Sequence, residues 1–284
     1  MRVRKYCRTF APLKWQNAKM KQRVIKTLLI SGGSSGIGKA TVDLFASKGW
    51  KVYELSRHGE SREHVHHIFC DVTDEQSVTA AVQTALQTTS HIDVVISNAG
   101  FGISGPIEFA EIAEVHRQFD VNFFGALHLT QAVLPQLRKQ HYGTIIYTSS
   151  VAAILSVPYQ AFYSASKAAI NAMALALQNE VRKFGIHVAV LMPGDVATGF
   201  TAARAKSDKG DTIYTHARKA VEAMEKDEQS GMTPAKMAHD LWCIANKHHP
   251  APQYVGGAPY KILCFLDRLL PKRLVNWIEG KLYS

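Results

Sequence analysis

Short apolar runs rich in β-branched residues alternate with longer segments of helical periodicity along the chain. The apolar runs show little every-second-residue alternation, which is typical of strands covered on both faces of a sheet. We therefore expect strands at 24–31, 51–56, 66–70, 92–98, 143–150, 186–193 and 253–257. Helices are expected near 37–48, 74–89, 111–140, 161–184 and 233–247.

This alternation predicts an α/β fold, a single doubly wound Rossmann-type domain with a parallel sheet and helices on both faces. No linker or internal repeat divides residues 24–258, and 284 residues can form one large domain. Sheets of this kind bind ligands beyond the carboxyl ends of their strands. Polar residues at those ends are therefore the candidates for a functional site.

Residues 1–23 differ in composition from this domain and are expected to form a disordered basic extension. They contain eight lysines and arginines and no acidic residue, and without them the net charge falls from +10 to +2. A nearly neutral body argues against a nucleic-acid partner. The segment lacks the apolar core of a secretory signal. We interpret it as an extension upstream of a natural start at Met20, with an organelle-targeting peptide or a membrane-surface arm as alternatives.

The opposite end, residues 259–284, is strongly apolar with interspersed lysines and arginines. Our first interpretation is a helix that completes the core or a dimer contact. The second is peripheral membrane contact or a lipid-facing substrate mouth. No stretch reaches the roughly 20 apolar residues that span a bilayer, and the four scattered cysteines are typical of reduced thiols. We expect a cytoplasmic protein, with membrane association through this segment as the alternative.

A glycine-rich turn follows the first strand, in the stretch SGGSSGIGKA with Gly32, Gly36 and Gly38. Such a turn lets the backbone approach a pyrophosphate, and the helix N-terminus that follows supplies N–H groups and partial positive charge. The spacing departs from the G-x-G-x-x-G fingerprint, and a tight strand–helix turn is the alternative reading.

The second strand ends at Ser56 and Arg57, where an NAD-binding chain of this fold places a carboxylate. A guanidinium pairs with a phosphate through two parallel hydrogen bonds, which favours NADP(H) as the cofactor. Glu54 is expected inside the strand rather than at its tip. The alternative is that Arg57 is an idle surface residue. His64, His66 and His67 cluster nearby but lack ligand spacing, so we expect no metal site.

Further polar clusters follow the third to sixth strands, in CDVTD, SNAG, YTSSVAA and LMPGDVATGF, and FDVNFFG carries Asn122. Tyr163 stands four residues before Lys167, which on a helix places both side chains on one face. With these motifs the chain resembles the short-chain dehydrogenase/reductase family over about 24–200. The resemblance implies a catalytic tetrad of Asn122, Ser150, Tyr163 and Lys167.

The same resemblance implies the cofactor contacts, in which Tyr163 and Lys167 also take part. The phosphates would lie against Ser31, Gly32, Ser34, Ser35, Gly36, Ile37 and Gly38. Asp71 and Val72 would border the adenine. The floor of the cofactor site would be shaped by Asn98, Ala99 and Gly100. The nicotinamide end would be flanked by Pro193, Gly194, Val196 and Thr198. Ser31 and the SNAG motif stand where Thr and NNAG are commoner in the family, and both changes keep a small polar group.

The pairing of Tyr163 with Lys167 has a chemical reason. A free tyrosine has a pKa near 10 and is a poor acid–base catalyst at neutral pH. We expect the Lys167 ammonium to lower that pKa. Tyr163 would then protonate a carbonyl oxygen that Ser150 also hydrogen-bonds, while Lys167 holds the nicotinamide ribose and Asn122 anchors a relay water.

These residues predict an NADP(H)-dependent oxidoreductase that interconverts a ketone and a secondary alcohol. The pocket walls are expected from 101–103, 151–159, Met192 and a mobile lid at 195–232. Because no arginine or lysine is expected near the site before residue 200, a bulky apolar substrate is favoured. The chain looks like the steroid, retinoid and lipid ketone reductase branch of the family.

Two rival functions remain open at this point. A 3-oxoacyl-thioester reductase would use Arg204, Lys206 and Lys209 on the lid to bind its carrier. An NADP-binding redox sensor would need only the cofactor half of the site. The resemblance also implies a homodimer or homotetramer built on the helices at 111–140 and 161–184.

Overall fold

The computed structural model describes residues 25–282 apart from positions 208 and 211. The basic segment 1–23, and with it the predicted extension, lies outside the described residues. Among the described residues, no helix is long and apolar enough to cross a membrane.

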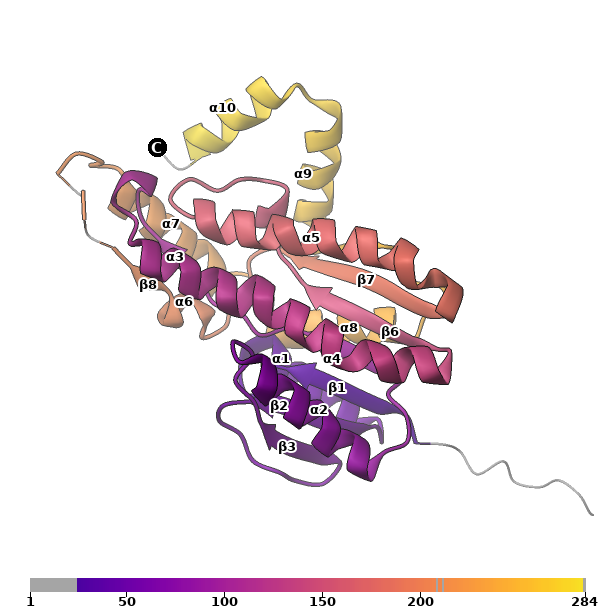
Figure 1. Ribbon diagram of the computed structural model, residues 1–284. Coiled ribbons are helices and arrows are strands. Elements are labelled where there is room, and N and C mark those ends of the chain that lie inside the picture. The colour runs from indigo at the N-terminus through magenta and orange to yellow at the C-terminus, as the bar shows by residue number, and fades with distance from the viewer. Residues whose placement is uncertain (1–24, 208, 211, 283–284) are drawn as a thin grey trace, which may run out of the picture.

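The centre of the molecule is a sheet of seven parallel strands in the order β3-β2-β1-β4-β6-β7-β9 (Figure 1). The order reverses between β1 and β4, which is the switch point where such sheets bind ligands. The strands are β1 (Thr27–Ser31), β2 (Lys51–Ser56), β3 (Val65–Phe69), β4 (Val94–Ser97), β6 (Gly143–Thr148), β7 (Ile186–Pro193) and β9 (Gln253–Gly256).

Helices cover both faces of this sheet. The helices of one face are α2 (Glu75–Thr88), α4 (Gly125–Gln140) and α5 (Ala161–Val181), and those of the other are α1 (Gly36–Ser47) and α8 (Pro234–Ala245). Along β1, Leu29 packs into the first layer, whereas Leu28 and Ile30 pack into the second. Both faces of the strand are therefore buried, which explains the near-continuous apolar run. The predicted fold class is confirmed.

The predicted helix at 111–140 is interrupted. It consists of α3 (Ile112–Phe119), a π-helical turn at Asp120–Phe124, and α4. The π turn holds Asn122, which is buried. One extra residue per turn changes the direction in which a side chain leaves the helix, and such turns are frequent at functional sites.

The segment 195–232, expected as a lid, contains its own elements: α6 (Phe200–Ala203), β8 (Ala205–Lys206) and α7 (Ala217–Gln229). Strand β8 pairs in parallel with β5 (Ile103–Ser104), and Val196 forms a bridge with Met232. The C-terminal segment forms two helices instead of one, α9 (Ala258–Leu269) and α10 (Lys272–Leu282). Pro271 separates them, because its ring cannot continue a helix.

Candidate active site

A cavity of about 820 Å³ lies at the carboxyl ends of the strands. Its wall runs from the turn between β1 and α1, past the ends of β2 and β6, to α7, α9 and α10. Most of the predicted site residues meet here, although they come from segments far apart in the chain. Those on the wall are Gly32, Ser34, Ser35, Gly36, Ile37, Ser56, Arg57, Asp71, Val72, Asn98, Ala99, Gly100, Ser150, Tyr163, Lys167, Pro193, Gly194, Val196 and Thr198.

Ser31 and Gly38 are not on the wall but shape it from behind. The Ser31 hydroxyl accepts a hydrogen bond from the Asn98 backbone N–H at 3.2 Å. A Cβ atom on Gly38 would lie 2.0 Å from the Gly32 carbonyl oxygen, so α1 packs against the turn only because residue 38 is a glycine. Gly32 itself has φ of +67°, a conformation that favours glycine.

The turn fits a pyrophosphate. The Asn98 side-chain N–H donates to the Gly32 carbonyl at 3.0 Å and so holds the loop in place. Helix α1 begins at Gly36 on the cavity wall, and the Ser35 side chain makes no capping hydrogen bond. The backbone N–H groups at this helix start are therefore left for an anion.

At the other side of the turn, the tip of β2 presents Arg57 to the cavity and keeps Glu54 away from it. Glu54 is buried within β2, and its Oε2 lies 2.6 Å from Nδ1 of His67. Asp71 stands beside Arg57 on the wall. Hydrogen bonding from Thr73 lowers the pKa of Asp71, and the Arg57 charge acts in the same direction.

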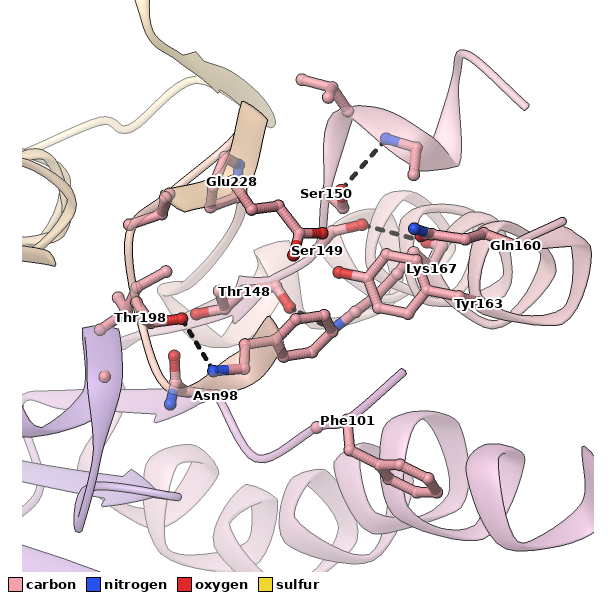
Figure 2. Close-up of a pocket in the computed structure, with 18 of the residues that line it drawn as sticks. Asn98, Phe101, Thr148, Ser149, Ser150, Gln160, Tyr163, Lys167, Thr198 and Glu228 are labelled. Carbon is pink, nitrogen blue, oxygen red and sulfur yellow. Dashed lines mark hydrogen bonds between the residues drawn. The ribbon is translucent and has the colours of Figure 1, made fainter. Parts of the chain in front are cut away.

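Ser150, Tyr163 and Lys167 gather on the same wall (Figure 2). Ser150 follows β6 and caps a short 3₁₀ turn, where its Oγ accepts from the Ala152 N–H at 3.1 Å. Tyr163 and Lys167 project from the first turns of α5, as their spacing predicts. The Lys167 ammonium donates to the Thr148 carbonyl at 3.0 Å and lies 5.7 Å from the centre of the Tyr163 ring.

The expected effect of Lys167 on the acidity of Tyr163 is wrong for the protein by itself. Burial raises the pKa of Tyr163 to about 12, and the hydrogen bond with Ser150 opposes this shift only in part. Burial also lowers the pKa of Lys167 to about 8. Both shifts have one cause, since removing water disfavours the charged form of each group. At Tyr163 burial is the largest cause of the shift, and it acts in the direction opposite to the one that the spacing alone predicts.

Asn122 does not line the cavity. Its side chain lies one layer behind, where the amide nitrogen donates to the Phe101 carbonyl and to Ser166 Oγ, each at 3.0 Å, and Oδ1 accepts from the Phe101 N–H at 3.0 Å. A Cβ atom on Gly100 would meet both Asn122 Oδ1 at 3.1 Å and Lys167 Nζ at 3.4 Å. Asn122 therefore joins the loop after β4 to α5, close to Lys167.

The predicted substrate walls need four corrections. Of the stretch 151–159, only Val151, Ala152, Leu155 and Val157 lie on the wall. Met192 is buried and lies off the cavity wall, because β7 directs it into the layer under α5. Gly102 and Ile103 also lie off the wall, since β5 pairs with β8 there. Arg117 does line the cavity, stacked at 4.6 Å over the ring of Phe101, so a basic residue before position 200 is present.

The three cations of the 195–232 segment that the rival thioester reductase would use are held by carboxylates. Arg204, whose side chain is fully buried, pairs with Glu228. Lys206 contacts Glu225 at 2.6 Å, and Lys209 pairs with Glu111. These pairs fasten the segment to itself and to the start of α3. The expectation that this segment offers open cationic groups is not supported by these contacts.

Sequence reasoning missed an acidic group on the wall. It consists of Asp195, Asp227 and Glu228, and in Figure 2 the Glu228 side chain points toward Ser150 and Tyr163. Glu228 accepts from the Thr201 hydroxyl at 2.5 Å, and Asp195 accepts from the Tyr260 hydroxyl. Asp195 follows Pro193-Gly194 directly and was detectable from that position, whereas Glu228 lies on a polar helix with no local signal.

The C-terminal segment supplies an apolar part of the wall, in line with the second interpretation of 259–284 as a substrate mouth. The apolar residues that α9, α10 and the turn between them place on the cavity wall are Leu263, Leu266, Leu270, Val275 and Ile278. Among the described residues, no group of three or more His, Cys, Asp or Glu side chains could hold a metal ion. The described cysteines, at positions 70, 243 and 264, are free thiols.

A doubly wound sheet with a glycine-rich cradle at its switch point, and a serine, tyrosine and lysine beside it, defines a nicotinamide-dependent oxidoreductase. Comparison with known proteins makes the class specific. Residues 26–209 match the short chain dehydrogenase family. The chain belongs to the short-chain dehydrogenase/reductase family, as its motifs predict.

Two curated relatives and one solved structure cover nearly the whole chain. The 3-ketodihydrosphingosine reductase of Bacteroides thetaiotaomicron is 38% identical over 262 residues, covering 90% of this chain and 97% of that protein. The NADPH-dependent 3-dehydrocapnine reductase of Ornithobacterium rhinotracheale is 30% identical, covering 89% and 95%. A short-chain dehydrogenase from Streptomyces avermitilis superposes with a TM-score of 0.78 at 26% identity, covering 90% and 97%.

Proposed function

We propose that this protein is an NADP(H)-dependent reductase of long-chain ketones that carry an amine next to the carbonyl. The observation that carries the proposal is the composition of the cavity wall around Tyr163, where carboxylates and leucines meet. The name of the Bacteroides relative supports it, because 3-ketodihydrosphingosine is a long-chain base with a ketone and an amine.

The acidic group supports an amine in the substrate. Asp195, Asp227 and Glu228 line the cavity, whereas the buried guanidinium that pairs with Glu228, that of Arg204, lies off the wall, so carboxylates outnumber cations at this part of the wall. The charges of Glu228 and Asp195 both raise the pKa of Tyr163, which places them within electrostatic reach of the proton donor. A protonated amine beside the carbonyl would be attracted by this field, and a carboxylate there would be repelled.

The apolar part of the wall supports an alkyl chain. Val151, Leu155 and Val157 follow Ser150, and the leucines of α9 continue the surface away from Tyr163. An apolar lining of this length favours a flexible hydrocarbon tail over a small polar ketone. The rival thioester reductase would need cations for its carrier, and Arg204, Lys206 and Lys209 are already paired.

In this reaction the nicotinamide, when bound, supplies or accepts the hydride. Tyr163 donates its proton to the carbonyl oxygen, and Ser150 hydrogen-bonds the same oxygen. The phenolate left on Tyr163 is then stabilised by the Lys167 ammonium. The Lys167 ammonium donates one hydrogen bond to the Thr148 carbonyl. Its other N–H groups would donate to the nicotinamide ribose and to a relay water that Asn122 would position.

We assign the cofactor as NADP(H) on the basis of Arg57. The guanidinium stands on the cavity wall, whereas the nearest carboxylate of β2, Glu54, is turned away and bonded to His67. A 2′-phosphate would thus meet a cation at this position. The Ornithobacterium relative is NADPH-dependent, which supports the same choice.

We also propose that the protein is a homodimer or homotetramer joined through the outer faces of α4 and α5. Leu175 on α5 and Phe124 at the start of α4 are partly exposed apolar residues on these elements. Burying them against a second copy would remove apolar surface from water.

The test compares two ketones of equal chain length, 3-ketodihydrosphingosine and its analogue without the amine, by NADPH absorbance. The amino ketone should have the higher kcat/KM, and NADH should replace NADPH poorly. Glu228→Gln keeps the shape and removes the charge, and both ketones share any effect of losing the pair with Arg204, so KM should rise at least fivefold more for the amino ketone than for the analogue. Tyr163→Phe should lower kcat for both ketones by about 10²–10⁴.

Some results would reject parts of the proposal separately. Equal rates with both ketones, unaffected by Glu228→Gln, would show that the enzyme does not recognise an amine. The protein would still be a ketone reductase. Faster turnover of acetoacetyl thioesters than of either ketone would favour the rival enzyme. Wild-type rates for Tyr163→Phe would show that the proton donor is wrong.

A further inference from the structure

We propose that the outer face of α9 and α10 docks the protein on a membrane that contains anionic lipid, with the mouth of the cavity turned toward the bilayer. The docking itself goes beyond the proposed function. The consequence for substrate entry rests on that function, since it requires an alkyl substrate.

Large apolar side chains stand in water on this face. We define the docking face as Ile262, Phe265, Leu269, Leu274 and Trp277. Of these, Phe265 is 60% exposed, Leu269 65% and Trp277 61%. In α9 these residues recur at positions i, i+3 and i+7, which places them along one stripe of the helix. A helix that completes the core, the first interpretation from the sequence, would have buried that stripe.

Charge is segregated across the same two helices. Lys261, Arg268 and Arg273 are exposed beside the docking face. The acidic residues turn inward, since Asp267 and Glu279 both lie on the cavity wall, and Asp267 is buried and accepts from Lys272 at 2.6 Å. The surface offered to a partner is therefore apolar and cationic. That combination suits acyl chains and anionic headgroups, with Trp277 at the boundary between them.

The docking face is continuous with the cavity. The inward side of the same helices carries Leu263, Leu266 and Ile278, which line the cavity and are themselves partly exposed. Figure 1 shows α9 and α10 as a hook at the edge of the molecule, and their inward residues share the cavity wall with Tyr163. An alkyl chain can thus pass from a bilayer to the site along apolar surface without crossing water.

A second copy of the chain is the competing occupant, and the charges argue against it. In a two-fold contact the same patch meets itself, so each cation of one copy would approach the cations of the other. Acidic residues that would relieve this repulsion are turned toward the cavity in both copies. Anionic lipid supplies the missing countercharge, at about 1 kcal/mol per basic residue near the surface.

The experiment is cosedimentation of the full chain with vesicles of phosphatidylcholine alone and with vesicles that also contain phosphatidylglycerol. The wild-type protein should bind the anionic vesicles and release them as salt is raised. The double variant Phe265→Ser with Trp277→Ser should bind at least tenfold more weakly. Phe69→Ser is the matched control, because Phe69 is an aromatic residue of 65% exposure on β3, at the other end of the molecule.

Turnover of a short, water-soluble ketone without vesicles separates docking from folding and from the proposed function. The double variant should keep the wild-type rate there, since neither of its residues lines the cavity. Absence of wild-type vesicle binding, or an equal loss in Phe69→Ser, would overturn docking whatever the enzyme reduces. Docking is also overturned if light scattering finds a dimer that the double variant dissociates and no lipid dependence.

Discussion

Tyr163 and Lys167 are neighbours in a site with little water, and burial acts on their proton affinities in opposite directions. The pKa of Tyr163 rises to about 12 and that of Lys167 falls to about 8. At neutral pH the pair is therefore a phenol and an ammonium, which is the state needed to protonate a carbonyl. Lys167 is close to losing its charge just above neutrality, so the ammonium is the pH-sensitive partner.

The shift at Lys167 predicts how stability depends on pH. The ordinary pKa of lysine is near 10.4, so between about pH 8 and pH 10 the unfolded chain binds more protons than the folded protein. Stability should then rise with pH across that window, by about 3 kcal/mol if Lys167 acted alone. Urea denaturation at several pH values measures it, and the contribution of Lys167 should be lost in Lys167→Met, which leaves the opposite effect of Cys70, whose pKa burial raises to about 11.

Lys39→Met is the control for this series, because Lys39 is exposed on α1 in a surface pair with Asp43. It should leave the pH slope as in the wild type. An unchanged slope in Lys167→Met would show that the lysine keeps its ordinary pKa. The raised pKa of Tyr163 affects stability at higher pH. Between about pH 10 and pH 12 Tyr163 keeps its proton in the folded protein and loses it in the unfolded chain, so stability falls there.

At the scale of elements, contacts at three places link the segment 195–232 to itself and to its neighbours. The Val196–Met232 bridge joins its two ends, and the pairing of β8 with β5 links it to the loop after β4. The ion pair between Arg204 and Glu228 joins the end of α6 to α7. This explains why a polar stretch with no strong apolar pattern keeps a defined place beside Tyr163.

Arg204 should therefore matter more for stability than the other cations of the segment. Arg204→Met leaves the Glu228 carboxylate without its partner in a buried site, which we expect to cost about 3–5 kcal/mol in the free energy of unfolding. Lys206→Met breaks a contact to Glu225 that is half exposed on the lysine side, and should cost less than about 1 kcal/mol. Urea denaturation of both variants gives the comparison, and equal losses would contradict it.

For the whole molecule, the proposed oligomer predicts a concentration-dependent mass. Light scattering should find a dimer or tetramer for the wild type, and Leu175→Glu should shift it toward the monomer by placing a charge in the contact. The double variant of the docking face should keep the wild-type mass. A monomeric wild type would remove the oligomer from the proposal, and it would leave the active site unaffected.

Most of the elements and the chemical half of the site could be predicted from the amino-acid sequence alone. Apolar runs without alternation mark the strands of the sheet, because burial on both faces requires apolar residues at successive positions. The turn from Gly32 to Gly38 and the pair Tyr163 and Lys167 are local features. Their spacing in the sequence predicts how their residues lie relative to one another within one turn of backbone. Such features can be predicted from the sequence when the residues that act together are close in the chain.

The π-helical turn at Asn122 could not be predicted from the sequence. A residue pattern that continues one helical period gives no sign that the backbone will widen by one residue per turn. The hydrogen bonds of Asn122 to Phe101 and Ser166 come from two other segments, and these contacts accompany the change.

The surroundings of Tyr163 depend on how distant segments pack together. Glu228 reaches the wall because Arg204 and Thr201 hold it there, and the leucines of α9 reach it because the chain turns back after β9. The inward direction of Asp267 and the outward direction of Phe265 are likewise set by which face of α9 meets the cavity. Contacts between distant segments depend on how whole elements pack, and the local order of residues does not encode them. For the same reason burial, rather than the nearby ammonium, decides the proton affinity of Tyr163.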